Sequence, residues 1–165
     1  MSLSSIIRSA VPEDATRICE IYNPYVLGSV VTFEEEAVSD ADMAGRIKDV
    51  TERLPWLVYE VDGEIVGYAY ATKWRVRAAY RYSVESTVYV KQTHIGRGIG
   101  KKLYMELLGR LKDLGMHTVM AGISMPNENS TALHEKLGFK KVAEFSEAGF
   151  KHGKWINTGY WQLML

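Results

Sequence analysis

The stretch Tyr82–Leu108 reads YSVESTVYVKQTHIGRGIGKKLYMELL, and its pattern predicts a strand, a glycine-rich turn and a helix. Residues 84–90 are dense in β-branched and aromatic side chains, which predicts a strand. The leucines that follow recur at the spacing of an amphipathic helix: Leu103, Leu107, Leu108 and Leu111. Between strand and helix lie Gly96, Gly98 and Gly100, which we call the glycine turn. A glycine-rich turn into a helix start presents backbone N–H groups and the positive end of the helix dipole, so it predicts a phosphate site.

The spacing of the glycine turn excludes two common phosphate-binding motifs. A P-loop would need a glycine at Ile95 and a hydroxyl residue at Lys102. The dinucleotide-binding fingerprint would need its third glycine at Lys101. A strand-to-helix turn that uses glycine only for its positive φ angles stays open as an alternative.

Length, charge and cysteine content restrict the class of protein. A chain of 165 residues can bury a substantial core, so we expect one domain, 1–165. The formal net charge of +0 gives no general field toward nucleic acid or a membrane surface, and no apolar run approaches a membrane span. The single Cys19 cannot form an internal disulfide, so we expect a cytoplasmic protein.

The rest of the chain alternates between strand and helix patterns. Pro12 suits the first turn of a helix that Asn23-Pro24 is expected to end, and Ser39 caps a second helix to about Glu52. Gly138 ends a helix that follows the loop 125–130. The remaining predicted strands are 6–9, 56–61, 65–72, 118–123, 141–150 and 155–164. This order predicts an α/β (mixed α+β) fold, with a mostly antiparallel sheet of about seven strands and helices on both faces.

Two further segments are candidates for the wall of a ligand pocket. Residues 25–38 are irregular yet apolar, and Phe33 within them either lines a pocket or fills the core. Trp74–Tyr82 concentrates three arginines and three aromatic residues in nine positions. The planar guanidinium groups of Arg75 and Arg77 suit a carboxylate, although a solvated basic loop has the same composition.

Taken with Glu85 on the preceding strand, the glycine turn resembles the acetyl-CoA motif of the GCN5-related N-acetyltransferase (GNAT) superfamily. The usual motif is Gln/Arg-x-x-Gly-x-Gly/Ala, and Ile95 here departs from its polar first position. That departure weakens one side-chain contact but leaves the backbone donors of the turn. A second match lies where the family would place it, with Asn127 followed seven residues later by His134.

Longer stretches resemble the phosphinothricin and methionine sulfoximine acetyltransferase subfamily. They are WRVRAAYRYSVESTVYV (74–90), LHEKLGF (133–139) and GFKHGKWINTGYWQL (149–163). The resemblance runs from about Ile7 to Leu163. It implies acetyl-CoA as co-substrate with no metal, a small amine acceptor of the amino-acid-analogue type, a role in detoxification, and a homodimer.

The resemblance also implies a set of site residues. Those that would hold acetyl-CoA are Val88, Tyr89, Val90, Gly96, Arg97, Gly98, Ile99, Gly100, Lys101 and Asn127. Those that would face the acceptor are Phe33, Arg75, Val76, Arg77, Glu85, Ser86 and Thr87. His134 stands where many members carry a tyrosine that protonates the departing thiolate. A histidine can exchange protons at neutral pH, although a helix histidine satisfied by a neighbour is an equal alternative.

The chemistry of amine acetylation favours Glu85 as the general base. A free α-amine is mostly protonated at neutral pH, so a base must take its proton before the nitrogen attacks a thioester. A glutamate on an apolar strand is partly desolvated, which raises its pKa toward a useful value. The alternative is a glutamate that merely pairs with Arg75 or Arg77. A backbone N–H near Tyr89 or Val90 would stabilise the oxyanion.

Other functions stay open from the sequence alone. A non-catalytic acetyl-CoA sensor would use the same glycine turn, but it would need neither Glu85 nor the arginine cluster. A polyamine acetyltransferase would have an acidic site, which the arginines disfavour. An acetyltransferase for protein N-termini would need an open groove.

Overall fold

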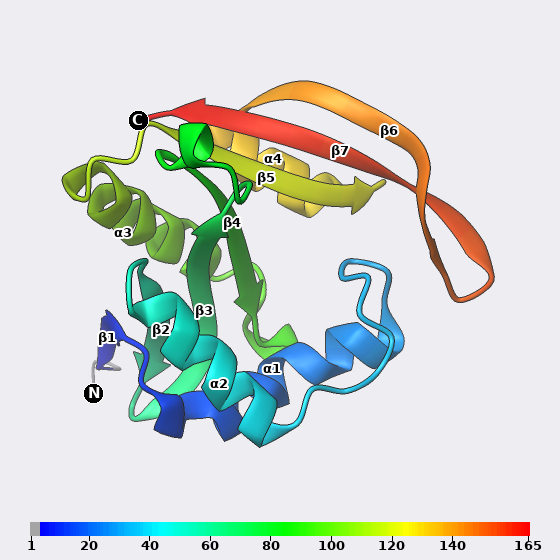
Figure 1. Cartoon of the computed structure of the whole chain (residues 1–165). Coiled ribbons are helices and arrows are strands. Elements are labelled where there is room, and N and C mark those ends of the chain that lie inside the picture. The colour runs from blue at the N-terminus through cyan, green and yellow to red at the C-terminus, as the bar shows by residue number, and fades with distance from the viewer. Residues whose placement is uncertain (1–3) are drawn as a thin grey trace.

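The computed structural model describes residues 4–165, so residues 1–3 of the predicted domain lie outside it. Seven strands form one sheet with helices on both faces, as predicted (Figure 1). In chain order the elements are β1 (Ser5–Ser9), α1 (Ala15–Gly28), α2 (Asp40–Thr51), β2 (Trp56–Val61), β3 (Glu64–Lys73), β4 (Ser83–Val90), α3 (Ile99–Asp113), β5 (Thr118–Met125), α4 (Glu128–Lys136), β6 (Lys140–Lys151) and β7 (Lys154–Met164).

The order of strands in the sheet is β1-β2-β3-β4-β5-β7-β6. Neighbouring strands are antiparallel except for β4 and β5. These two pair in parallel only over Ser83–Glu85 and Thr118–Met120, although β4 continues to Val90 and β5 to Met125. Beyond the paired residues the strands diverge (Figure 1). The divergence leaves one edge of β4 open, and an open edge presents backbone N–H and C=O groups to whatever lies beside it.

Side chains of the sheet alternate between two cores on its opposite faces. In β2, Leu57 and Tyr59 pack in the core that includes α3, whereas Trp56 and Val58 pack in the core that includes α1 and α2. The predicted leucine stripe of α3 is fully buried in the first core at Leu103, Leu107 and Leu111. Within residues 4–165, no helix is long and apolar enough to cross a membrane.

Helix α1 is longer than the sequence predicts, because it continues through Pro24 to Gly28. Proline lacks an N–H and crowds the preceding turn, which is why the sequence predicts an end at Asn23-Pro24. Tyr22 before the proline and Val26 after it are both buried in the core of α1 and α2. Burial on both sides of the proline offsets the missing hydrogen bond, and the predicted end is wrong.

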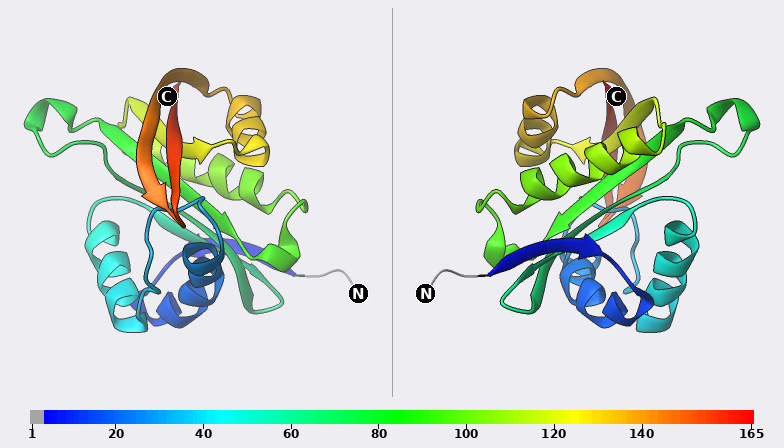
Figure 2. Two further views of the ribbon diagram at one scale, coloured as in Figure 1. Left: turned by 90° about the vertical axis from the view of Figure 1, so that its right-hand side faces the viewer. Right: turned by 90° about the vertical axis from the view of Figure 1, so that its left-hand side faces the viewer.

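Tight two-residue turns connect β2 to β3 and β6 to β7. Asp62-Gly63 and His152-Gly153 each have positive φ at both residues, as two-residue turns require. Glu64 already pairs with Val61, so the longer loop predicted at Glu64 is wrong. The second turn ends the long β6–β7 hairpin, which descends toward the loop after α1 (Figure 2).

Candidate active site

The glycine turn joins β4 to the N-terminus of α3. Gly96 and Gly98 have φ angles of 82° and 75°, and Gly98 is the N-cap residue. A Cβ at either position would meet nothing within 4 Å, so the backbone conformation rather than lack of space favours glycine. The Lys102 N–H donates to Gly98 O at 3.1 Å, so the N–H groups of residues 99–101 precede the helical hydrogen bonds. With the positive end of a 15-residue helix behind them, these groups are placed where they could hold an anion.

The segment Val88–Val90 lies on the part of β4 that has diverged from β5. Its other edge is paired with β3, where Gly67, Tyr68 and Ala69 are the partners. The Tyr25 hydroxyl donates to Val90 O at the end of the strand. The open strand edge and the glycine turn are therefore continuous along the chain.

Glu85 is the last residue of β4 that pairs with β5, so it lies where these two strands begin to diverge. Its half-buried side chain contributes to a cavity of about 460 Å³. Burial raises the pKa of Glu85 above its ordinary value, and the positive charge of Arg75 opposes the shift. The lining residues are Tyr22, Val31, Thr32, Phe33, Tyr70, Glu85, Thr87, Tyr89, Gly122, Ser124, Phe145, Ala148, Thr158 and Tyr160. Glu85 is the one carboxylate among them.

Hydroxyl groups give this cavity most of its hydrogen-bonding capacity. The Tyr22 and Thr32 hydroxyl oxygens lie 2.7 Å apart. The Thr158 hydroxyl is buried and has no hydrogen-bond partner among the described residues. Such a group can bind a ligand oxygen or nitrogen without first giving up a protein partner.

Ser86, Tyr104 and His134 form a buried chain of hydrogen bonds on the opposite face of the sheet. Ser86 Oγ lies 2.8 Å from the Tyr104 hydroxyl, which lies 2.7 Å from His134 Nε2. His134 Nδ1 lies 2.6 Å from the Ser130 carbonyl, which can only accept, so the network assigns the proton to Nδ1. Nε2 then accepts from Tyr104. Burial lowers the pKa of His134, which favours the neutral imidazole.

The structure separates the two predicted catalytic side chains. Successive residues of a strand point to opposite faces, so Glu85 faces the cavity while Ser86 faces α3 and the Tyr104 hydroxyl. Ser86 and His134 therefore do not line the cavity. The prediction that Ser86 faces the acceptor beside Glu85 and Thr87 is corrected by this alternation.

Of the other predicted acceptor residues, Phe33 and Thr87 line the cavity with Glu85, whereas the arginine segment does not. Val76 is 95% exposed, and the Arg75 guanidinium lies 4.4 Å from the centre of the Trp74 ring. The segment follows β3 as an exposed turn at the side of the cavity, because Trp74 packs against the lining residue Tyr160 with ring centres 5.4 Å apart and the charge of Arg75 acts on Glu85.

Asn127 is the N-cap of α4 rather than a loop residue before it. Its Oδ1 accepts a hydrogen bond from the Ser130 N–H at 3.1 Å. The sequence places the cap at the end of the loop 125–130, so the helix starts earlier than predicted. The side-chain oxygen of Asn127 is thus engaged in ending the loop.

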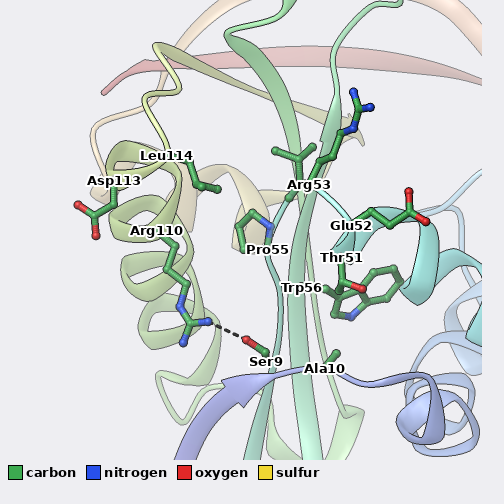
Figure 3. A pocket seen from close by; sticks show the side chains of 11 residues that line it. Ser9, Ala10, Thr51, Glu52, Arg53, Pro55, Trp56, Arg110, Asp113 and Leu114 are labelled. Carbon is green, nitrogen blue, oxygen red and sulfur yellow. Dashed lines mark hydrogen bonds between the residues drawn. The ribbon is translucent and has the colours of Figure 1, made fainter.

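A second cavity of about 480 Å³ lies away from these residues (Figure 3). It is bounded by Ser9, by the chain between α2 and β2, and by Arg110 and Leu114 at the end of α3. Arg110 donates to Ser9 Oγ at 2.9 Å across it. None of the predicted site residues lines this cavity.

No local pattern in the sequence predicts the part of the cavity that α1, β5 and the β6–β7 hairpin provide. Tyr22, Ser124 and Tyr160 come from elements far apart in the chain, and although Tyr160 lies in the stretch 149–163, none of the three is predicted as a site residue. Tyr89 is predicted to hold the cofactor through its backbone, and the structure adds its ring to the cavity wall. Within residues 4–165, no group of three or more His, Cys, Asp or Glu side chains is placed to hold a metal ion.

Comparison with known proteins finds matches over almost the whole chain. A family model described as acetyltransferase (GNAT) domain matches residues 7–159. A phosphinothricin N-acetyltransferase from Streptomyces viridochromogenes is 40% identical over 156 residues, which are 94% of this chain and 85% of the relative. An L-methionine sulfoximine/L-methionine sulfone acetyltransferase from Salmonella typhimurium is 37% identical over 96% of this chain and 94% of the relative. A phosphinothricin acetyltransferase from Sinorhizobium meliloti, solved in complex with acetyl-CoA, superimposes with a TM-score of 0.94 at 40% identity, covering 100% of this chain and 89% of that one.

Proposed function

The chain belongs to the GNAT acetyltransferases, and from that premise we propose that it moves the acetyl group of acetyl-CoA to the α-amine of a small amino-acid analogue. Acceptors of the methionine sulfoximine, methionine sulfone or phosphinothricin type are the ones named for its relatives. A role in detoxification would follow from such acceptors. The observation that carries the proposal is Glu85, which sits half-buried at the divergence of β4 and β5 and faces a cavity of small-molecule size.

Two backbone features fit acetyl-CoA. The N–H groups of residues 99–101 would bind its pyrophosphate, with Arg97 and Lys101 as exposed cations nearby. The open edge of Val88–Val90 would hydrogen-bond the amide groups of the pantetheine arm. Asn127, at the start of α4, is proposed to complete this side of the site. Acetyl-CoA supplies an activated thioester, and the chain supplies donors along one continuous path.

Glu85 would act as the general base, directly or through a water molecule. The raised pKa of Glu85 makes it a stronger proton acceptor than an exposed glutamate. The nearby positive charge of Arg75 favours the ionised form of Glu85. Removal of a proton from the incoming ammonium is the step that this carboxylate can perform.

The cavity suits an acceptor with several oxygens. Its volume of about 460 Å³ lies in the range of small-molecule sites, which run from roughly 300 to 1,000 Å³. The hydroxyl groups of Tyr22, Thr32 and Thr158 could bind carboxylate, phosphinic or sulfoximine oxygens. Phe33 and Phe145 offer apolar contact to the aliphatic part of the acceptor.

Protonation of the leaving thiolate is proposed to involve His134 indirectly. The Tyr104 hydroxyl lies between His134 and Ser86 of β4. Because Nε2 of His134 accepts from Tyr104, His134 would orient the Tyr104 hydroxyl, and a water molecule would supply the proton to the thiolate.

We also propose a homodimer in the cytoplasm. Phe150 and Trp155 on the β6–β7 hairpin are 55% and 64% exposed and pack against each other with ring centres 4.8 Å apart. An exposed aromatic pair of this kind favours burial against another copy. Sedimentation velocity at several protein concentrations tests the dimer, and a monomer at all of them would contradict it.

Release of free CoA tests the proposed reaction. The purified protein is mixed with acetyl-CoA and a panel of methionine sulfoximine, methionine sulfone, phosphinothricin, spermidine and ordinary amino acids. We expect turnover with the first three compounds and the acetylated α-amine as the product in mass spectra. Turnover of spermidine alone, or acetyl-CoA binding with no turnover of any amine, would contradict the proposal.

A further inference from the structure

Two segments far apart in the sequence form the outer wall of the cavity. The loop between α1 and α2, residues 29–39, carries the lining residues Val31, Thr32 and Phe33. The β6–β7 hairpin carries the lining residues Phe145 and Ala148. The hairpin reaches down onto this loop (Figure 2). The shape of the acceptor site therefore depends on how these two segments are held together.

Lys151, the last residue of β6, joins the two segments. Its side chain is buried, and Nζ donates to Val26 O at 2.7 Å and to Thr32 O at 2.8 Å. Val26 lies in the last turn of α1, which has no basic residue of its own. Carbonyl groups at a helix C-terminus lack helical partners and carry partial negative charge, so a cation there is favourable. Lys151 thus caps α1 and fixes the loop that follows it.

Gly149 makes the second contact between hairpin and loop. A Cβ at this position would overlap the Phe33 ring, so the ring lies directly on the backbone of the hairpin. Gly149 and Lys151 are two residues apart on the strand, and both are buried while Phe150 between them is exposed. The same face of β6 therefore contacts Val26, Thr32 and Phe33.

The opposite side of the loop is held by α1 and α2. The Tyr22 hydroxyl lies 2.7 Å from Thr32 Oγ1 and also contacts Glu34. Arg46 pairs with both oxygens of Glu34, at 3.0 and 2.6 Å. Thr32 is thus bound through its side chain to the body of the domain and through its carbonyl to Lys151.

We propose that Lys151 is a positioning residue for the acceptor, because it fixes Thr32 and Phe33 at the cavity through the carbonyls of Val26 and Thr32. The inference rests on the proposed acetyl transfer for its kinetic consequence, but its structural consequence can be measured without turnover. Loss of the ammonium leaves two buried carbonyls unpaired and releases the loop from the hairpin. The glycine turn is untouched by this change, so acetyl-CoA binding stays as it is.

Lys151→Met tests the inference, with Lys154→Met on the same hairpin as the matched control because Lys154 is exposed. We expect the KM for the amino-acid acceptor to rise roughly tenfold, as loss of hydrogen bonds to a charged group implies, with an unchanged KM for acetyl-CoA. Lys151→Arg keeps a cation and should restore part of the acceptor affinity. The inference would be overturned if the KM for the acceptor were equal in the Lys151→Met and Lys154→Met variants. It would also be overturned if Lys151→Met raised the KM for the acceptor and the KM for acetyl-CoA in parallel.

Hydrogen exchange provides the second readout. Amides of residues 29–34 should exchange faster in Lys151→Met than in Lys154→Met, while amides of α3 exchange alike. If the wild-type protein acetylates no amine, the proposed function fails, and this comparison alone decides whether Lys151 holds the loop. Should Lys151→Met not fold, Lys151→Gln, whose side chain is polar but shorter and uncharged, replaces it in both measurements. Unaltered exchange of the loop in a folded variant would refute the positioning role.

Discussion

The glycine turn and the acceptor cavity are built in different ways. The turn uses backbone donors from one continuous segment, and its only strict requirement is glycine where φ is positive. The cavity uses side chains from α1, the following loop, β3, β4, β5 and the β6–β7 hairpin. The first region depends on local conformation and the second on tertiary packing, so substitutions should affect them separately.

The largest expected effect comes from Glu85→Gln, which keeps the shape of the cavity and removes its base. We expect kcat/KM to fall by about 10² to 10⁴ at neutral pH, the usual contribution of a general base. The acid limb of the pH profile should disappear with it. In the wild type that limb lies above the ordinary glutamate pKa of 4.5, because burial raises the pKa and activity is lost as pH falls through it.

Glu52→Gln is the matched control, since Glu52 is exposed and lies at the second cavity. Equal kcat/KM for Glu85→Gln and wild type across the pH range would remove Glu85 from the role of base. The cavity would then have to recruit a water or another residue for proton removal.

The next effect separates the two regions directly. Gly98→Val places a β-branched residue at a φ of 75°, which costs about 1–3 kcal/mol and distorts the turn. We expect the dissociation constant of acetyl-CoA, measured by calorimetry, to rise roughly fivefold to 150-fold, the equivalent of that cost. Gly98→Asn should be milder, because asparagine tolerates positive φ. Unchanged acetyl-CoA affinity in a folded Gly98→Val variant would show that the anion site lies elsewhere.

Tyr104→Phe tests the buried hydrogen-bond chain of Ser86, Tyr104 and His134. Removing the hydroxyl leaves His134 Nε2 buried without its donor, so the free energy of unfolding should fall by about 1–3 kcal/mol. Urea unfolding measures this change, and Tyr82→Phe at a half-exposed site is the control. A loss of kcat well beyond that of the control, with a folded protein, would place the chain in the chemistry. Unaltered stability would show that the network is not satisfied as the structure has it.

Arg75→Ala should give the smallest effect. Its charge lowers the pKa of Glu85, so removing it should raise that pKa and move the acid limb of kcat/KM to higher pH. Arg81→Ala is the control because Arg81 lies in the same exposed segment, over the Tyr82 ring. A shift of the acid limb toward lower pH would contradict the predicted direction of the pKa change of Glu85. A rise in the KM for the acceptor would place Arg75 in the acceptor site, as the sequence predicts.

The same difference explains what the sequence could predict. The strand, the glycine turn and the leucine stripe follow local rules, and the predicted order of elements is confirmed. The continuation of α1 beyond Pro24 depends on core packing around Tyr22 and Val26, which no local pattern records. The burial of His134 depends on α3 and α4 meeting over β4, so spacing from Asn127 could not reveal its partners.

The cap on α1 also has a consequence for biosynthesis. Lys151 and Val26 are separated by 125 positions, so the C-terminus of α1 is capped by a residue of β6, the sixth of the seven strands. A nascent chain can form the glycine turn before the hairpin has left the ribosome, because that turn needs only neighbouring residues. The acceptor wall must wait for the β6–β7 hairpin, since contacts between distant segments form only after both have been synthesised. We therefore expect the glycine turn to form during synthesis before the proposed acceptor pocket takes shape.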